Sequence, residues 1–116
     1  MKRKNTKIYK ELVERYCRNR YEVESRSNDV AEHNKVIAEH HAAFNDLDGV
    51  LKANDYVRTW YKEFIKMHEL SIVFATQVID HFSESVEKDG ETLRNDYGAD
   101  LDVVFKEFQE RENGGV

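Results

Sequence analysis

The chain has 116 residues, of which 40% are apolar and 35% are charged, with one cysteine and no proline. This composition is too apolar and too aromatic for a disordered chain, and no apolar run reaches the roughly 18 residues that a membrane helix needs. The lone Cys17 cannot form an internal disulfide, and no apolar signal segment follows the basic N-terminus. We therefore expect a cytoplasmic protein with a single domain over residues 1–116.

Charge is distributed unevenly along the sequence. Residues 1–26 carry nine Lys or Arg and four Glu, a net charge of +5, whereas residues 27–116 carry a net charge of −10. An asymmetry of this kind can steer a partner or pair two copies of a chain. We divide the domain into a basic helix end at 1–26, an acidic body at 27–112 and a frayed tail at 113–116.

A seven-residue repeat of apolar side chains runs through the first half of the sequence. A sustained repeat of this period is typical of helices packed at small crossing angles, as in a coiled coil. It predicts a helix over residues 6–44, with Thr6 as the N-cap. The members of the repeat are Tyr9, Tyr16, Val23, Val30, Ile37, Phe44 and Leu51.

The second position of this repeat is weaker and leaves an alternative open. The segment SRSND at 25–29 favours a helix poorly, and Asp29 with Glu32 has the spacing of a capping box. The alternative is therefore two helices that meet near Asn28, although the unbroken repeat favours one continuous helix. The second-position residues are Leu12, Asn19, Arg26, His33, His40 and Leu47, of which only the two ends are apolar.

A cluster of Asn, Asp and Gly at 45–55 predicts a turn. Asn54 or Asp55 can cap a second helix over residues 55–89. We expect this helix to end near Gly90, because glycine favours the C-terminal cap of a helix.

The second helix is apolar around most of its circumference, which is typical of a helix buried by several neighbours. We predict that four of its residues are buried in the core: Phe64, Ile72, Ile79 and Phe82. A further stripe widens its apolar surface: Tyr56, Trp60, Met67, Leu70, Phe74 and Val78.

After an interruption at Gly98, a shorter third helix is predicted over residues 99–112. The predicted architecture is all-α: a long antiparallel helical hairpin and a shorter C-terminal helix, similar to a coiled coil or helical bundle. These helices cannot cover the whole second helix, so we expect a homodimer to complete the bundle, with parallel and antiparallel pairing both open. The predicted seam of this oligomer consists of Tyr16, Val23, Val30, His33, Ile37, His40 and Phe44.

Three of the five histidines lie in the segment AEHNKVIAEHHAAF at 31–44. Metal ligands on one helix need a spacing of three or four residues, whereas His33 and His40 lie seven apart, about 10.5 Å along a helix. The Glu-x-x-His pattern of di-metal helical bundles is absent from the sequence. We therefore expect neither a metal nor a cofactor, and interpret these histidines as polar layers or surface positions.

The sequence contains no glycine-rich phosphate loop and no nucleophile motif, so we predict no catalytic residues. The leading hypothesis is a non-enzymatic protein-interaction module, an adaptor, inhibitor or regulator of a larger partner protein. The alternative is a nucleic-acid-binding module, since basic helices bind phosphates and tyrosines stack on bases. The candidate residues for either partner are Lys7, Lys10, Arg15, Arg18, Arg20 and Tyr21.

Overall fold

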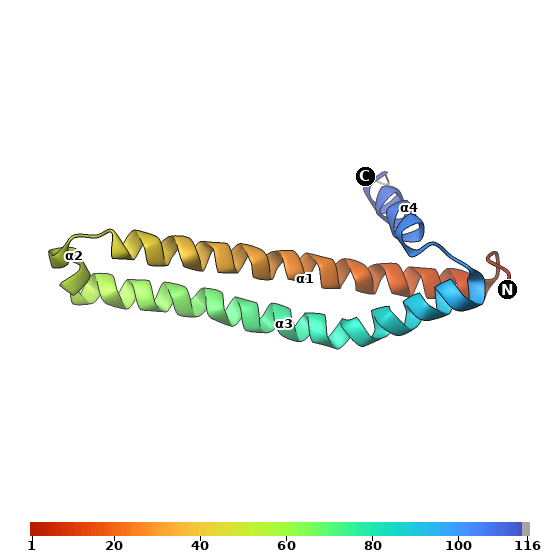
Figure 1. The fold of residues 1–116 in the computed structure, drawn as a ribbon, viewed down its shortest axis with the longest axis horizontal. Coiled ribbons are helices and arrows are strands. Elements are labelled where there is room, and N and C mark those ends of the chain that lie inside the picture. The colour runs from red at the N-terminus through yellow and green to blue at the C-terminus, as the bar shows by residue number, and fades with distance from the viewer. Residues whose placement is uncertain (115–116) are drawn as a thin grey trace. The chain divides into compact units, whose positions relative to one another are not determined.

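The computed structural model describes residues 1–114, and over that range helices joined by short turns are the regular structure, with no strand. They are α1 (Lys7–Asn45), α2 (Gly49–Ala53), α3 (Asp55–Tyr97) and α4 (Leu101–Gly114), as Figure 1 shows. The predicted all-α class is confirmed, and so is the order of two long helices followed by a shorter one. None of the helices among these residues is long and apolar enough to span a membrane.

The chain forms two compact units, and α1 and α3 contribute to both. Unit 1 contains Met1–Glu24 and the chain from Asp80 onward, and unit 2 contains Ser25–Ile79. The helix α1 is continuous across the division, so the alternative of two helices that meet near Asn28 is wrong. The predicted single domain stays a prediction.

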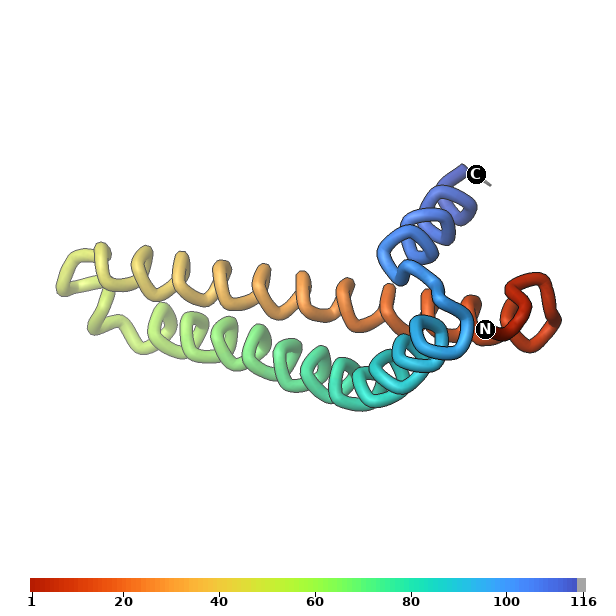
Figure 2. The backbone as a smooth tube through the Cα atoms, turned by 45° about the vertical axis from the view of Figure 1, so that its right-hand side comes forward, coloured from red at the N-terminus to blue at the C-terminus, as the bar shows by residue number. Residues whose placement is uncertain are grey.

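In unit 1, the beginning of α1, the end of α3 and α4 surround one apolar core. The Thr6 hydroxyl accepts a hydrogen bond from the Tyr9 amide at 3.2 Å, as predicted for the N-cap. In the views of Figures 1 and 2, α4 follows the end of α3 and lies beside the first turns of α1. The core consists of Leu12, Tyr16, Cys17, Leu93, Tyr97, Ala99, Phe105 and Phe108.

The prediction that the second helix ends near Gly90 is wrong, because α3 continues to Tyr97. Gly90 is buried inside the helix, and a side chain there would meet both Tyr16 and Leu101 at 3.2 Å. The absence of a side chain at Gly90 therefore allows the helices to pack closely at this point. The helix ends instead at Gly98, which has a positive φ of 63° and whose amide donates to the Arg94 carbonyl.

A charged pair lies next to this close approach. The guanidinium of Arg15 donates two hydrogen bonds to the carboxylate of Asp89, at 2.8 and 2.7 Å. The Asp89 side chain is only 9% exposed, whereas that of Arg15 is 61% exposed. A buried carboxylate without a partner is costly, so this pair allows α3 to place an aspartate against α1.

In unit 2, the second part of α1 packs against the first part of α3, with α2 in the turn between them. The Asp48 side chain caps α2 by accepting from the Leu51 amide at 2.9 Å, and Asn54 caps α3 by accepting from Val57 at 3.1 Å. The predicted turn and the Asn54 cap are therefore confirmed.

The burial of the second helix differs from the prediction. Phe64, Ile72, Ile79 and Phe82 are each only half-buried in the single chain, so the prediction that they are buried is wrong for the single chain. The buried α3 residues within unit 2 are Ile65 and Ala75. Three of the four lie in unit 2, where only α1 and the short α2 pack against α3, which is too little to enclose it; Phe82 lies in unit 1, outside the core around Leu93.

The third helix begins at Leu101 and ends at Gly114, close to the predicted 99–112. The Asp100 carboxylate accepts hydrogen bonds from the amides of Asp102 and Val103, which caps α4. Of the predicted frayed tail, Asn113 and Gly114 belong to α4, and residues 115–116 lie outside the described residues.

The two turn glycines provide a matched test of these helix ends. We predict that Gly98→Ala destabilises the protein by about 1–2 kcal/mol, because an L-residue at this positive φ is strained. Gly49→Ala is the control, since a methyl group there meets no other atom within 4 Å. Urea denaturation of both variants should show a loss of stability for Gly98→Ala alone. Equal midpoints would contradict this role of Gly98.

The Arg15–Asp89 pair can be measured by a double-mutant cycle. We expect a coupling free energy of about 1–2 kcal/mol between Arg15→Ala and Asp89→Ala, a value moderated by the exposure of the arginine. The control is the exposed Glu84–Lys88 pair within α3, for which we expect no measurable coupling. If Arg15 and Asp89 contributed additively, the pair would not be what stabilises this contact.

Candidate protein-interaction surfaces

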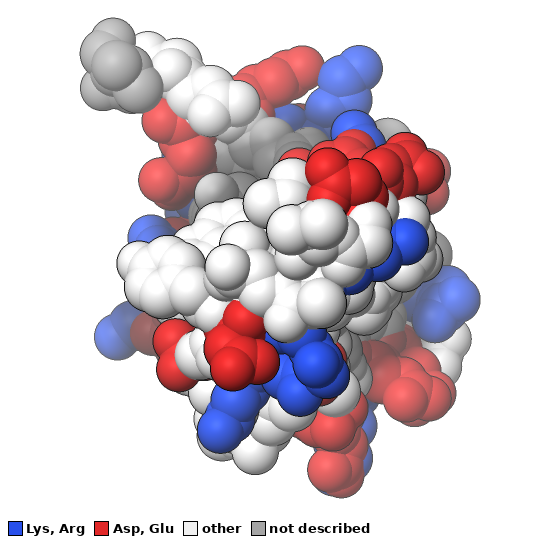
Figure 3. Space-filling view, turned by 90° about the vertical axis from the view of Figure 1, so that its left-hand side faces the viewer, with Lys and Arg blue, Asp and Glu red and all other residues white. Residues whose placement is uncertain are grey.

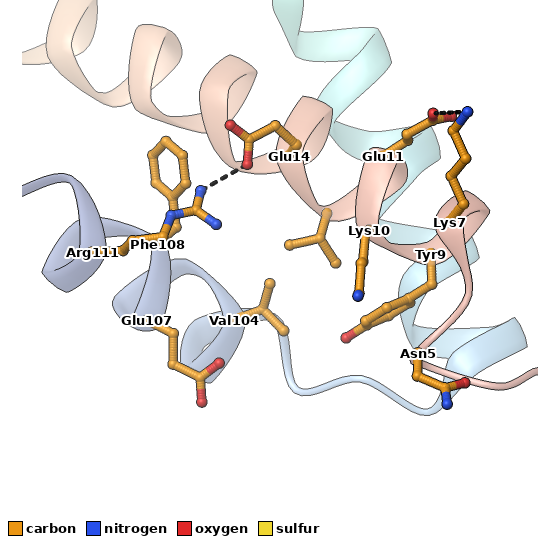
Figure 4. Close-up of a pocket in the computed structure, with 11 residues that line it drawn as sticks. Asn5, Lys7, Tyr9, Lys10, Glu11, Glu14, Val104, Glu107, Phe108 and Arg111 are labelled. Atoms are coloured by element: carbon orange, nitrogen blue, oxygen red, sulfur yellow. Dashed lines mark hydrogen bonds and ion pairs between the residues drawn. The ribbon is translucent and has the colours of Figure 1, made fainter.

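An open cleft of about 960 Å³ lies between the first turns of α1 and α4 in unit 1. In Figure 4, Tyr9 and Lys10 extend from α1 toward α4, and Val104 and Phe108 lie on the α4 side. Val13 completes the apolar floor, and the charged residues Lys7, Lys10, Glu11, Glu14, Glu107 and Arg111 form the rim. We call this site the unit 1 cleft.

Ion pairs fix much of the rim. Glu14 pairs with Arg111 of α4 and with Arg18 of α1, each at 2.7 Å, and Lys7 lies 3.8 Å from Glu11. The hydrogen bond from Arg111, together with that from Arg18, lowers the pKa of Glu14. Burial and the nearby Glu107 raise the pKa of Tyr9. Both groups therefore keep their resting forms at neutral pH, the carboxylate charged and the phenol neutral.

The candidate binding residues all lie in unit 1, and most of their charges are used within the chain. Lys7 and Lys10 line the unit 1 cleft. Arg18 and Tyr21 line a smaller neighbouring groove of about 490 Å³ beside Phe108. Arg15 binds Asp89, as described above.

Arg20 is the most fully engaged of these cations. Its guanidinium donates to the Tyr16 hydroxyl at 3.1 Å and to the carboxylates of Asp102 and Glu24 at 3.1 and 3.2 Å. It also lies 4.2 Å from the ring centre of Phe105, a cation–π distance. Burial acts to lower the pKa of Arg20, but these hydrogen bonds raise it overall. Arg20 therefore joins α1 to α4 and is not a free phosphate ligand.

Four of the seven predicted seam residues contact α3 of the same chain, Tyr16 in unit 1 and His33, His40 and Phe44 in unit 2. Tyr16 is buried in the core of unit 1, and Phe44 stacks on Tyr61 at 4.2 Å in unit 2. Val23, Val30 and Ile37 are half-buried. Their role in an oligomer stays a prediction.

The seam histidines meet partners that the sequence pattern did not identify. His33 and His68 share a hydrogen bond between their Nδ1 atoms at 2.8 Å, and the His40 ring stacks on Phe64 at 4.0 Å. His41 contacts the hydroxyl of Tyr61. Over residues 1–114, no three His, Cys, Asp or Glu side chains are grouped so that they could hold a metal ion. The arrangement is a polar and aromatic layer between α1 and α3 in unit 2.

One side of α3 in unit 2 carries exposed apolar side chains. Their exposed fractions run from 52% to 83%. We call this set the α3 face: Tyr56, Trp60, Met67, Leu70, Val73 and Phe74. Val50 and Leu51 of α2 are exposed too, and Figure 3, which views the α2 end, shows uncharged side chains in the middle and charged ones around them.

Sequence reasoning missed the α4 side of the unit 1 cleft. Arg111 lies 97 residues from Glu14, and no local pattern relates the two. Val104 and Phe108 belong to the predicted third helix, but their position opposite α1 depends on tertiary packing. By contrast, five of the six residues of the α3 face were identified as an additional apolar stripe.

Cys17 is fully buried, and its thiol lies 3.9 Å from the Val104 carbonyl. Burial, with the nearby Glu14 acting in the same direction, raises the pKa of the thiol from 9.0 to about 11. The folded state thus holds the proton more tightly than the unfolded state. The resulting stabilisation is complete below the unfolded pKa and is lost as the pH rises through the folded one.

We therefore predict that stability falls between about pH 9 and pH 11, and that Cys17→Ala shows a smaller fall. Urea denaturation across this range measures the free energy of unfolding of both proteins. Tyrosines and lysines also titrate here, but they contribute equally to both proteins and cancel in the difference. A thiol reagent should react with the folded parent protein only as fast as the chain unfolds. Rapid labelling at pH 8 would contradict the buried position of the thiol.

Comparison of the chain with protein-family models, with curated proteins and with solved structures gave no match. The features of the described chain that bear on function are the unit 1 cleft and the α3 face.

Proposed function

We propose that this chain is a non-enzymatic protein-interaction module, an adaptor, inhibitor or regulator, that binds a segment of a larger protein in the unit 1 cleft. The observation that carries the proposal is the cleft itself, which combines an apolar floor with a rim of both charge signs. Protein-binding surfaces commonly combine an apolar centre with a polar rim. Such a cleft fits a peptide segment that has apolar side chains on one face and charges at its edges.

The protonation states in the cleft support binding rather than catalysis. General acid–base catalysis favours a group whose pKa lies near the working pH. Here the pKa of Glu14 moves down and that of Tyr9 moves up, each away from neutrality. The buried Cys17 thiol, with its raised pKa, is a poor nucleophile.

The alternative, a nucleic-acid-binding module, has weaker support. Arg15, Arg18 and Arg20 each bind carboxylates of the chain, so that phosphates would have to displace these ion pairs. Binding to DNA or RNA oligonucleotides that weakens steeply with added salt would favour this alternative. We expect no such binding at physiological salt.

The test of the proposal uses two matched valine variants. Val13 lies on the cleft floor, whereas Val103 is a half-exposed residue of α4 outside the cleft. A partner captured from the native source and then purified should bind Val13→Asn about tenfold more weakly than the parent, because an unsatisfied amide faces the apolar contact. Val103→Asn should bind as the parent does, with calorimetry as the measurement.

Thermal melts of both variants establish that the fold is kept. A partner that binds Val13→Asn as tightly as the parent would show that the cleft is not the docking site. A partner lost equally with Val103→Asn would place the contact elsewhere on α4.

A further inference from the structure

The α3 face in unit 2 is large enough to be an interface. At about 200 Å² for a fully exposed large apolar side chain, its six members expose roughly 740 Å² in total. Each partner of a stable protein–protein interface contributes about 800 Å², and exposed apolar patches of this size on a lone chain mark interaction sites. A surface of this area is therefore a candidate interface for another protein chain.

The spacing along the face fits another helix at a small crossing angle. Trp60, Met67 and Phe74 are seven residues apart, and Tyr56 and Leu70 lie beside them in the second position of a seven-residue pattern. From Tyr56 to Phe74 the face extends over about 27 Å of helix. This is the spacing of a coiled-coil seam. Its side chains touch α1 only at the edge, where Arg26 lies over the Phe74 ring and His40 lies near Trp60, and more than half of each of these two face residues stays exposed.

The seam can pair with a second copy of itself that runs in the opposite direction, because apolar residues then lie opposite apolar residues at both ends. In an antiparallel pair whose facing residue numbers add up to 130, Tyr56 lies opposite Phe74 of the second copy. Trp60 then lies opposite Leu70, and Met67 opposite Glu63. Every large apolar side chain at the two ends thus meets another, and the only charged layers are the two at the centre.

The charges of the segment favour the same pairing. Residues 55–79 contain three basic and three acidic residues, so two copies do not repel each other. Glu63 and Lys66 are exposed and form no ion pair with other described residues. In this register Glu63 lies opposite Met67 of the other copy, so the next residue along, Lys66, lies beside Glu63. The opposite charges of Glu63 and Lys66 therefore compensate each other in the central layers.

We propose that the α3 face binds a second copy of this chain, as an antiparallel pair of α3 segments centred near Ile65. Two hairpins of unit 2 then form a four-helix core, in which the twofold axis lies between the two Glu63–Lys66 contacts. This contact uses unit 2 alone and leaves the unit 1 cleft of each copy unused.

The proposal is tested first by the mass of the protein in solution and then by exchanging the charges of Glu63 and Lys66. Sedimentation at tens of micromolar should give twice the chain mass of 13.7 kDa. Glu63→Lys and Lys66→Glu should each weaken the dimer about tenfold, because each brings like charges together twice in the symmetric pair. The double variant Glu63→Lys with Lys66→Glu should restore the parental dissociation constant.

Two controls make the outcome specific. Glu69→Lys changes the charge equally but lies two residues from Met67, about 200° around the helix, and should dimerise like the parent. A parallel pair would place Glu63 opposite its own copy, and the double variant would then give no rescue. Met67→Lys should yield a helical monomer, as followed by circular dichroism, since Met67 is 61% exposed and not part of the core.

A monomeric parent at these concentrations would overturn the proposal and leave the α3 face to another protein. A dimer that Met67→Lys leaves intact would place the contact on a different surface. These variants do not change the unit 1 cleft. Neither result therefore affects the test of partner binding with Val13→Asn.

Discussion

The close approach of α3 to α1 at Gly90 is the contact on which unit 1 depends. With no side chain at this position, the Tyr16 ring and Leu101 can occupy the space beside the helix. The neighbouring Asp89 then reaches Arg15, which neutralises a buried carboxylate. A larger residue at 90 would separate the helices and remove both the core contact and the ion pair. The placement of α4, and with it the unit 1 cleft, follows from this contact.

The helix α3 is more deeply buried in unit 1 than in unit 2, because more long helices pack against it in unit 1. In unit 1, α1 and α4 enclose α3, so that Leu93 is completely buried. In unit 2, α1 and the five-residue α2 cover one side of α3, and Trp60 and Met67 stay more than half exposed. A helix that is apolar around most of its surface needs more than one long neighbour. In the dimer proposed above, the antiparallel second copy supplies the missing neighbour of α3 in unit 2.

Local sequence signals predicted most of the helices but few of the contacts between them. Thr6 and Asn54 were identified as caps because a cap depends on residues three positions away. Gly90 was misassigned, since a glycine for helix packing and a glycine for a helix end look the same in the sequence. The contacts of Arg15 with Asp89 and of Arg111 with Glu14 span 74 and 97 residues. Such contacts follow from the packing of the helices, which no local pattern encodes.

The charge asymmetry of the sequence is largely compensated by folding. The basic segment 1–24 and the acidic chain from Asp80 belong to the same unit, which has twelve basic and fifteen acidic residues and a net charge of −3. Unit 2 has six basic and eight acidic residues, a net charge of −2. A gradient from +5 to −10 along the sequence therefore produces two weakly acidic units. Weak and similar net charges permit the pairing of two copies and disfavour a nucleic-acid surface, since its phosphates would meet arginines already bound to carboxylates.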